Sequence, residues 1–579
     1  MEKYYTEERN AQVIVSLLKE HGIRKVIASP GTTNMALVVS MQNDPYFEMY
    51  SSVDERSAAY MACGLAAESG EPVVLSCTGA TASRNYSPGL TEAYYRKLPI
   101  LAITSTQAVS KVGHHIAQII DRSSIPNDVA KLSLSLPIIK DEEDLWDCEI
   151  KVNRAILELR RHGGGPVHLN LPTTYNKTYS VKELPKYRVI NRITFGNEFP
   201  ELPEGKVGVF VGAHSTWSTE QTDLLDRFCA SNNAVVFCDH SSGYKGKYRV
   251  VYSLAACQQM YDHSNNPDIL IHIGELTGDY YSLAITGKQV WRVSEDGEIR
   301  DTTRKLRYVF EMSEKNFFAH YTNNDRNDSD SYLKICKNHL NELYNKIPEL
   351  PFSNIWIASK ISHRIPQDST IHFGILNSLR SWNFFEIPGS VLSASNVGGF
   401  GIDGIISSLI GASFSNKNKL YFGVLGDLAF FYDMNVLGNR HVGNNLRILL
   451  VNNGTGTEFR QYQHLGAQFG EDADQYIAAG GHFGKKSPVL VKHYAQDLGF
   501  EYLSASNKGD FDQVFERFLI SEVTEKPIIL EVFTNSLDES EALEKIMNIE
   551  ENIKGKVKQV AKQVLGENSL NILKRVMGK

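Results

Sequence analysis

The stretch of residues 420–455 constrains the fold most, because two short apolar runs flank a helix-compatible segment within it. Residues 420–425 are predicted to form a strand that leads into Asp427, and residues 448–451 a second strand that leads into Asn453. Strands joined through a helix lie parallel in one sheet and end at the same edge. We therefore expect Asp427 and Asn453 to lie close together, although a whole helix separates them in the sequence.

The groups expected at this edge are a carboxylate from Asp427, an amide oxygen from Asn453 and a carbonyl of the following loop. Such an oxygen-only half-shell suits Mg²⁺, which completes its octahedron with phosphate oxygens. The pattern therefore indicates a magnesium site for a bound diphosphate. The alternative is an ordinary parallel β-α-β unit, in which loop Asp and Asn residues only cap helices.

The same alternation of apolar runs and helical stretches continues along the chain, which predicts an α/β fold of three open parallel-sheet domains. A chain of 579 residues is long enough for about three or four domains. The predicted domains cover residues 1–185, 190–348 and 352–540, and a basic amphipathic tail covers 541–579. The strand candidates of the first two domains are KVIASPGT, PVVLSCTG, PILAITS, GPVHLNLP, VGVFVG, NAVVFCD, DILIHIG and QVWRVSED.

Composition excludes several classes of function. The formal net charge of −7 gives no basic field for nucleic acid. Seven cysteines are scattered without a CxxC pair, so neither a disulfide framework nor a zinc site is expected. The absence of a signal peptide and of a long apolar run favours a cytoplasmic protein. The tail is expected to pack on its own domain, or to contact a membrane surface or a partner protein.

The Gly-Asp and Asn-Asn motifs resemble the signature of thiamine-diphosphate-dependent enzymes. Leu428 at the third position of the first motif, and the segment 395–413, are similar to the MenD-like (SEPHCHC synthase) branch, which lies near the acetolactate-synthase-like enzymes. The resemblance implies pyrimidine-binding, central Rossmann-like and diphosphate-binding domains in this order. It also implies that Asp427, Asn453 and the backbone carbonyl of Thr455 hold Mg²⁺. The cofactor-binding residues that it implies are Pro30, Gly31, Thr78, Ile402 (an apolar wedge under the cofactor), Gly426, Asp427, Leu428, Asn453, Thr455 and Gly456.

A second motif surrounds Glu55, which is predicted to open a helix with small residues on one face. Small residues let this helix approach the sheet closely, so Glu55 is expected at a tight junction that holds little water. The motif resembles the glutamate of thiamine-diphosphate enzymes that protonates the cofactor's aminopyrimidine ring. The alternative is a helix N-terminal Glu that only interacts with the macrodipole.

The loop sequence KVGHHIAQIIDR resembles the segment that supplies an active-site Gln, or paired His, in this family. Gln118 and His115 are therefore candidate catalytic residues, because an imidazole there could deliver a proton and Gln118 fits the family's Gln position. A solvated polar loop is the alternative.

Two arginines expected from the MenD-like branch are absent, one after the Ser-Pro-Gly turn and one in the segment before Gly-Ile-Asp-Gly. A substrate carboxylate needs cationic or polar donors. Arg84 and Arg460 are candidate replacements, although either could form a surface or interdomain ion pair instead. Thr32, Asn85 and Gln118 complete the predicted substrate-binding set.

The resemblance implies decarboxylation of a 2-oxoacid, either 2-oxoglutarate or pyruvate, with thiamine diphosphate and Mg²⁺ and transfer of the acyl-anion equivalent to an acceptor. The alternatives are a simple decarboxylase, a flavin-free acetolactate-synthase-like enzyme and a degenerate, non-catalytic family member. It further implies a homodimer or homotetramer whose active sites lie at subunit interfaces, with Glu55 and Asp427 of one site from different chains.

Overall fold

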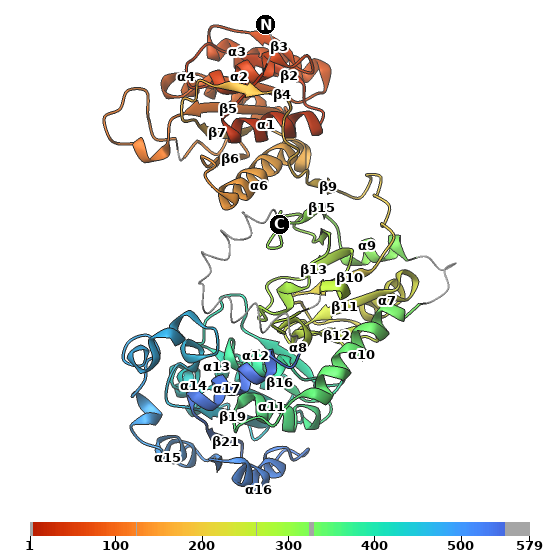
Figure 1. Cartoon of the computed structure of the whole chain (residues 1–579), viewed down its shortest axis with the longest axis vertical. Coiled ribbons are helices and arrows are strands. Elements are labelled where there is room, and N and C mark those ends of the chain that lie inside the picture. Colours follow the sequence, from red (N-terminus) through yellow and green to blue (C-terminus); the bar gives the residue numbers. More distant parts are fainter. Residues whose placement is uncertain (1–3, 123, 262, 323–328, 551–579) are drawn as a thin grey trace, which may run out of the picture. The chain divides into compact units, whose positions relative to one another are not determined.

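The computed structural model describes residues 4–122, 124–261, 263–322 and 329–550 (Figure 1). The chain divides into two compact units. The first is built from the described residues of 1–198 and 297–311, and the second from those of 199–296 and 312–579. The predicted basic tail lies outside the described residues from 551 onward, and within the described part no helix is long and apolar enough for a membrane span.

The first unit contains a parallel sheet with the strand order β3-β2-β4-β5-β7-β6. Its strands are β2 (Lys25–Ala28), β3 (Glu48–Ser51), β4 (Val73–Thr78), β5 (Ile100–Thr106), β6 (Leu132–Ser135) and β7 (Val167–Pro172). One face packs on α1 (Arg9–Glu20), α2 (Met35–Asn43) and α6 (Glu142–Glu158). The other packs on α3 (Glu55–Ser69), α4 (Ala80–Asn85) and α5 (Ser87–Tyr95). Both faces are covered, which explains why the central strands β4 and β5 begin with apolar runs.

The segment after the first sheet carries two short strands. β8 (Tyr179–Val181) pairs antiparallel with β1 (Tyr5–Thr6), which fastens the segment to the start of the chain. β9 (Asn191–Ile193) pairs in parallel with β15 (Leu306–Phe310), and both belong to the first unit. This connecting segment therefore takes part in the first unit's structure.

The second unit begins with parallel strands in the order β12-β11-β10-β13-β14. These strands are β10 (Val207–Val211), β11 (Ala234–Cys238), β12 (Arg249–Val251), β13 (Ile269–Ile273) and β14 (Gln289–Val293). The helices of this part are α7 (Thr219–Asn232), α8 (Ser253–Ala256), α9 (Glu314–Tyr321) and α10 (Ser331–Lys346). Each strand predicted here from an apolar run is present.

The rest of the second unit contains a parallel sheet with the order β17-β16-β18-β19-β21-β20. Its strands are β16 (Thr370–Phe373), β17 (Leu392–Ser395), β18 (Tyr421–Gly426), β19 (Leu446–Asn452), β20 (Glu501–Ala505) and β21 (Ile528–Phe533). The helices are α11 (Asn354–Ile361), α12 (Asn377–Asn383), α13 (Ile405–Ser413), α14 (Asp427–Asp433), α15 (Leu490–Asp497), α16 (Lys508–Phe518) and α17 (Ser536–Met547). The predicted α/β fold with open parallel sheets is confirmed, whereas the exact domain bounds stay a prediction.

Glu539 is a buried carboxyl that joins three elements of this last part. Its Oε1 accepts hydrogen bonds from Asn354 N at 3.0 Å and from Thr534 Oγ1 at 2.8 Å. Its side chain is fully buried, and its Oε2 has no partner among the described residues. Burial raises the pKa of Glu539 to about 7. The folded protein therefore holds this proton more tightly than the unfolded chain does.

Stability is expected to fall between pH 4.5 and pH 7 because of Glu539. Its pKa is raised on folding, so its contribution is complete below the unfolded value of 4.5 and is lost as the pH rises through about 7. The expected loss is about 3 kcal/mol. In the Glu539→Gln variant this part of the pH dependence should disappear, as measured by urea unfolding from pH 4.5 to pH 8. The exposed Glu541→Gln variant is the control, and an unchanged profile in Glu539→Gln would contradict the assignment.

Candidate active site

The carboxyl ends of β18 and β19 meet as the sequence predicts. Gly426 pairs with Val451 in the parallel register of the two strands. Asp427 opens α14 with 4% of its surface exposed. Its Oδ2 accepts from Gly454 N at 2.7 Å, and its Oδ1 accepts from Leu428 N at 2.9 Å. The predicted approach of the two motifs is confirmed, because a hydrogen bond joins them directly.

The oxygen atoms at this edge fit a hard divalent cation. Burial raises the pKa of Asp427 to about 6, against the opposing effect of its backbone hydrogen bonds. The Oδ1 of Asn453 is buried and has no hydrogen-bond partner among the described residues. The carbonyl of Thr455 accepts one hydrogen bond, from Thr457 N at 2.9 Å, which leaves its second lone pair for a ligand bond. A cation bound to these oxygens would compensate the buried charge and occupy the unpaired amide oxygen.

The loop that follows β19 is fastened at several points. Thr455 Oγ1 and Gly456 N both donate to Ala478 O, at 2.8 Å and 2.5 Å. Farther along the loop, Glu458 forms an ion pair with Arg380 of α12. The Nη2 of Arg380 donates to both carboxylate oxygens of Glu458, at 2.6 Å and 2.7 Å. Both side chains of this pair are largely buried. The loop therefore keeps its shape through contacts that do not use the three oxygen atoms proposed to bind the metal.

Breaking the ion pair is expected to destabilise the second unit. In an Arg380→Gln variant the Glu458 carboxylate stays buried without its cation, which costs about 3 kcal/mol or more. The free energy of unfolding in urea measures this loss. Arg517→Gln is the matched control. Arg517 also donates to both carboxylate oxygens of its partner, Glu501, but this ion pair is more exposed. Breaking it is expected to cost about 1 kcal/mol or less. Equal costs for both variants would rule out a special role for the Arg380 pair.

Apolar and small residues line the same loop. A Cβ on Gly456 would lie 3.1 Å from Ala478 O and 3.4 Å from Leu428 Cδ1, so the loop and the start of α14 are closely packed here. Ile402 lies before α13 and packs against the core cluster that contains Leu425 and Phe430. The predicted wedge residue is thus held by the domain core and remains partly accessible.

Glu55 is the first residue of α3 in the first unit. The preceding residue, Asp54, caps the helix, since its carboxylate accepts from Arg56 N at 2.9 Å and from Ser57 Oγ at 3.1 Å. Glu55 Oε2 instead accepts from Asn85 Nδ2 at 3.3 Å. The capping task is therefore performed by Asp54, and the Glu55 side chain stays partly exposed and accessible to a ligand.

The small-residue face of α3 packs against the sheet, as the sequence predicts, and also against another helix. Ala59 and Cys63 share one core cluster with Leu75 and Cys77 of β4. A Cβ on Gly89 of α5 would lie 2.5 Å from Ala59 Cβ, and Cys63 Sγ donates to Gly89 O at 3.2 Å. The contact with α5 was not predicted, and it is possible because Gly89 lacks the side chain that would separate the two helices.

The turn after β2 holds the predicted cofactor residues of the first unit. A Cβ on Gly31 would lie 2.6 Å from Thr78 Cβ, so the turn after β2 touches the end of β4. Thr33 Oγ1 lies against the Thr78 hydroxyl. Pro30 and Thr32 flank Gly31 and are exposed. These groups lie at the carboxyl ends of the parallel strands, where open α/β sheets bind ligands.

Known protein families and sequences match this chain over long stretches. Residues 9–125 match the profile described as "Thiamine pyrophosphate enzyme, N-terminal TPP binding domain". The chain is 30% identical over 548 residues to a 2-succinyl-5-enolpyruvyl-6-hydroxy-3-cyclohexene-1-carboxylate synthase of Bacteroides thetaiotaomicron, covering 92% of this chain and 97% of that protein. The chain belongs to this family of thiamine pyrophosphate enzymes. A synthase of the same name from Phocaeicola vulgatus is 30% identical over 562 residues, with 92% and 96% covered. One from Flavobacterium psychrophilum is 27% identical over 555 residues, with 90% and 96% covered.

The predicted family and enzymatic nature of this thiamine pyrophosphate enzyme are thereby confirmed, and thiamine pyrophosphate is its cofactor. The individual residue assignments stay predictions, and the geometry supports some of them more directly than others. His115 and Gln118 are exposed, and both have a positive φ, of 55° and 66°. Such backbone is costly for a residue with a side chain. Among the described residues, no hydrogen bond connects either of them to Glu55.

The two candidate substrate arginines have partners within their own units. Arg84 Nη2 donates to the carbonyl of Asp121 at 2.9 Å. Arg460 forms an ion pair with Asp474 at 2.5 Å. Arg122 was not among the predicted site residues, although its guanidinium is buried beside Arg84. The sequence signal that could have indicated Arg122 is its position four residues after Gln118, in the same polar loop.

Proposed function

We propose that this enzyme decarboxylates a 2-oxoacid, either 2-oxoglutarate or pyruvate, and transfers the remaining acyl unit to an acceptor. The observation that carries the proposal is the oxygen cluster at the ends of β18 and β19, where the buried Asp427 carboxylate meets the Gly454 amide beside the unpaired Asn453 Oδ1. It is supported by the similarity to relatives that are named carboxylate synthases.

In this proposal Asp427, Asn453 and the carbonyl of Thr455 hold Mg²⁺ against the cofactor diphosphate. The bound cofactor supplies an electron sink for the carbanion character that develops when CO₂ leaves. Glu55 holds a proton at a ring nitrogen of the cofactor, and Asn85 keeps the carboxylate oriented. Ile402 and Leu428 provide apolar surface that excludes water from the reacting carbon.

The acceptor is proposed to differ from that of the MenD-like branch, because two expected arginines are absent from this chain. The turn at 29–34 carries no arginine, and neither does the segment 395–404. Thr32, Asn85 and Gln118 provide polar groups for substrate, and Arg84 and Arg460 are the candidate cations. Arg84 and Arg460 are proposed as replacements for the two absent arginines, since Arg84 precedes Asn85 and Arg460 follows the predicted Mg²⁺ loop.

The active unit is proposed to be a homodimer or homotetramer in which Glu55 and Asp427 of one site come from different chains. Exposed apolar side chains cluster around α3 and α5 in the first unit. Val53 is 80% exposed and Tyr95 is 70% exposed, and Tyr60 and Met61 are about half exposed. Exposed apolar side chains in such numbers are typical of a protein–protein interface. A cytoplasmic location stays a prediction.

The deciding experiment titrates the full chain with thiamine diphosphate and Mg²⁺ and measures CO₂ release from a panel of 2-oxoacids, with and without candidate acceptors. Cofactor-dependent CO₂ release that requires an acceptor is the expected result. Release without any acceptor would replace the proposal by a simple decarboxylase. Formation of acetolactate from pyruvate alone would indicate the acetolactate-synthase-like alternative. A chain that binds no cofactor at saturating Mg²⁺ would overturn the proposal altogether.

A further inference from the structure

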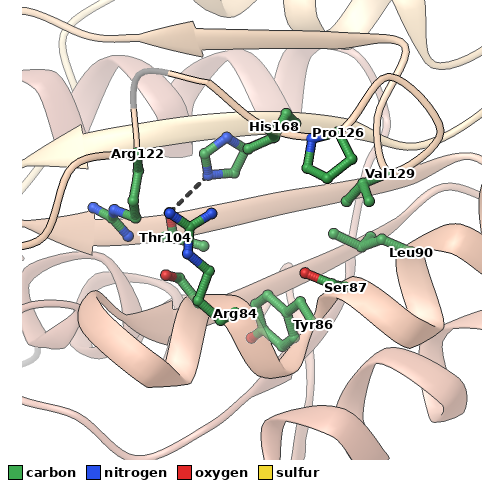
Figure 2. Close-up of a pocket in the computed structure, with 11 residues that line it drawn as sticks. Arg84, Tyr86, Ser87, Leu90, Thr104, Arg122, Pro126, Val129 and His168 are labelled. Atoms are coloured by element: carbon green, nitrogen blue, oxygen red, sulfur yellow. Dashed lines mark hydrogen bonds between the residues drawn. The ribbon is translucent and has the colours of Figure 1, made fainter.

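A small cavity lies in the first unit, between the sheet and the segment that follows Gln118 (Figure 2). Its volume is about 30 Å³, which is enough for one or two water-sized groups. The sheet contributes Thr104 of β5 and His168 of β7 to its wall. Arg84 of α4 and Arg122 of the 107–129 segment project toward these two residues (Figure 2).

Arg122 is a buried cation with an unused donor. Its residue is 6% exposed, and its Nη2 donates to Asn170 Oδ1. Its Nη1 is buried and has no hydrogen-bond partner among the described residues. Burial lowers the pKa of Arg122 to about 10, which still leaves the guanidinium charged at neutral pH. A buried charged donor without an acceptor is costly, so a bound acceptor is expected to stabilise it.

The surrounding charges are positive as well. Arg84 adds a second guanidinium, and the charge of Arg84 opposes that of Arg122. Within the described residues, neither arginine forms an ion pair with a carboxylate, and Arg84 Nη2 donates only to a backbone carbonyl. Two like charges that converge on one cavity are stabilised by an anion between them.

His168 does not supply a compensating group. Its Nε2 and Nδ1 lie 2.7 Å from Thr104 Oγ1 and 2.8 Å from Ser133 Oγ, so both ring nitrogens are already engaged. Complete burial lowers the pKa of His168 to about 3, with further lowering by the two arginines. The ring is therefore neutral near pH 7. The rest of the wall combines the apolar Leu90, Ile125, Pro126 and Val129 with the polar Ser83, Tyr86 and Ser87. A cavity of about 30 Å³ holds only a small anion.

We propose that this cavity binds one small monovalent anion between the guanidinium groups of Arg122 and Arg84. The ligand is either a free ion of formate or halide size, or the carboxylate of a small organic acid whose remainder lies along the apolar rim. The site shares Arg84 with the candidate substrate residues but does not rest on the proposed function, because Arg122, its buried cation, has no role there. It also has a structural consequence, because the Arg122 guanidinium lies 3.5 Å from a Cβ built on Gly79, at the end of β4. An anion that holds Arg122 in place thereby fixes the segment that carries Gln118.

The test measures thermal unfolding of the full chain while sodium formate replaces sodium gluconate at constant ionic strength. Gluconate serves as the reference because it is too large for the cavity. The melting temperature is expected to rise with formate and to saturate, as for a single binding site. In Arg122→Gln the midpoint concentration should increase at least about tenfold, because charged hydrogen bonds to the anion are lost. Arg84→Gln should show a smaller shift in the same direction.

The matched control is Arg96→Gln, since Arg96 is an exposed arginine of the same unit that pairs with Glu92 outside the cavity. It should respond to formate as the unaltered protein does. Bromide soaked into crystals of the unaltered protein should give an anomalous peak within hydrogen-bond distance of Arg122 Nη1. This second measurement also covers the case in which Arg122→Gln does not fold. No saturating response to formate, an equal response in Arg122→Gln, or bromide only elsewhere would overturn the site.

Competition distinguishes the two sources of the anion. If pyruvate raises the formate midpoint competitively, the cavity takes the carboxylate of a small organic acid. If pyruvate does not compete while bromide does, the cavity holds a free ion. Both results keep the site, and neither depends on CO₂ release. A protein that binds formate at Arg122 but releases no CO₂ with any 2-oxoacid would refute the proposed function and leave this site standing.

Discussion

An Asp427→Asn variant is expected to lose the stabilisation that thiamine diphosphate and Mg²⁺ give to the unaltered protein. The substitution removes the only carboxylate among the three proposed metal ligands and replaces one of its oxygens with an NH₂ group. At ligand concentrations about a hundredfold above the dissociation constant, binding stabilises a protein by about 2.7 kcal/mol. Thermal unfolding with and without the cofactor should show this gain in the unaltered protein and no measurable gain in the variant. Calorimetric titration with thiamine diphosphate at saturating Mg²⁺ should agree.

Asp427→Asn also has a structural cost, for which Asp433→Asn is the matched control. The NH₂ group that the substitution introduces would face one of the two backbone N–H groups from which Asp427 now accepts, at a cost of about 1–3 kcal/mol. Asp433 lies at the other end of α14 and likewise accepts two hydrogen bonds, from Ser407 N at 2.7 Å and Ser407 Oγ at 2.6 Å. Asp433→Asn should therefore be destabilised similarly and still respond to cofactor. A cofactor response retained in Asp427→Asn would remove Asp427 from the metal site.

The fold could be predicted because parallel sheets covered on both faces leave a strong signal in the sequence. β4, β5, β10 and β19 are almost entirely buried, so each contains a run of mainly apolar residues. The position of Asp427 and Asn453 at one edge of the sheet could be predicted in the same way, because the turns that follow parallel strands lie at the same edge. The small-residue face of α3 meets the sheet as predicted. Its second partner, α5, could not be predicted, because no periodicity reveals the contact between Gly89 and Ala59.

The cavity between Arg84 and Arg122 lay beyond sequence reasoning for a different reason. Arg122 belongs to an irregular segment, and its burial arises from long-range contacts with Asn170 and with the end of β4. An arginine in a polar loop is usually exposed, so nothing in its neighbourhood indicates a buried cation. The Arg380–Glu458 pair was missed in the same way, because 78 positions separate its members. Such contacts become visible only when the sheets are assembled.

A Glu55→Gln variant is expected to lose about 10²- to 10⁴-fold in the rate of CO₂ release, which is the usual contribution of a positioned acid or base. Glutamine keeps an oxygen that can accept from Asn85 Nδ2, and the helix cap is formed by Asp54, so the start of α3 should remain intact. The loss should therefore appear in kcat, with the affinity for thiamine diphosphate nearly unchanged. Steady-state CO₂ release and calorimetric titration with the cofactor measure the two effects separately.

The control for this variant is Glu68→Gln, an exposed carboxylate near the other end of the same helix. It removes one negative charge from α3 without touching the Glu55–Asn85 contact, and its rate should match that of the unaltered enzyme. An undiminished rate in Glu55→Gln would exclude proton transfer through this carboxyl. A loss of cofactor affinity as large as the loss of rate would instead assign Glu55 to binding, because the cofactor's ring would then need the carboxylate for its affinity as much as for its reactivity.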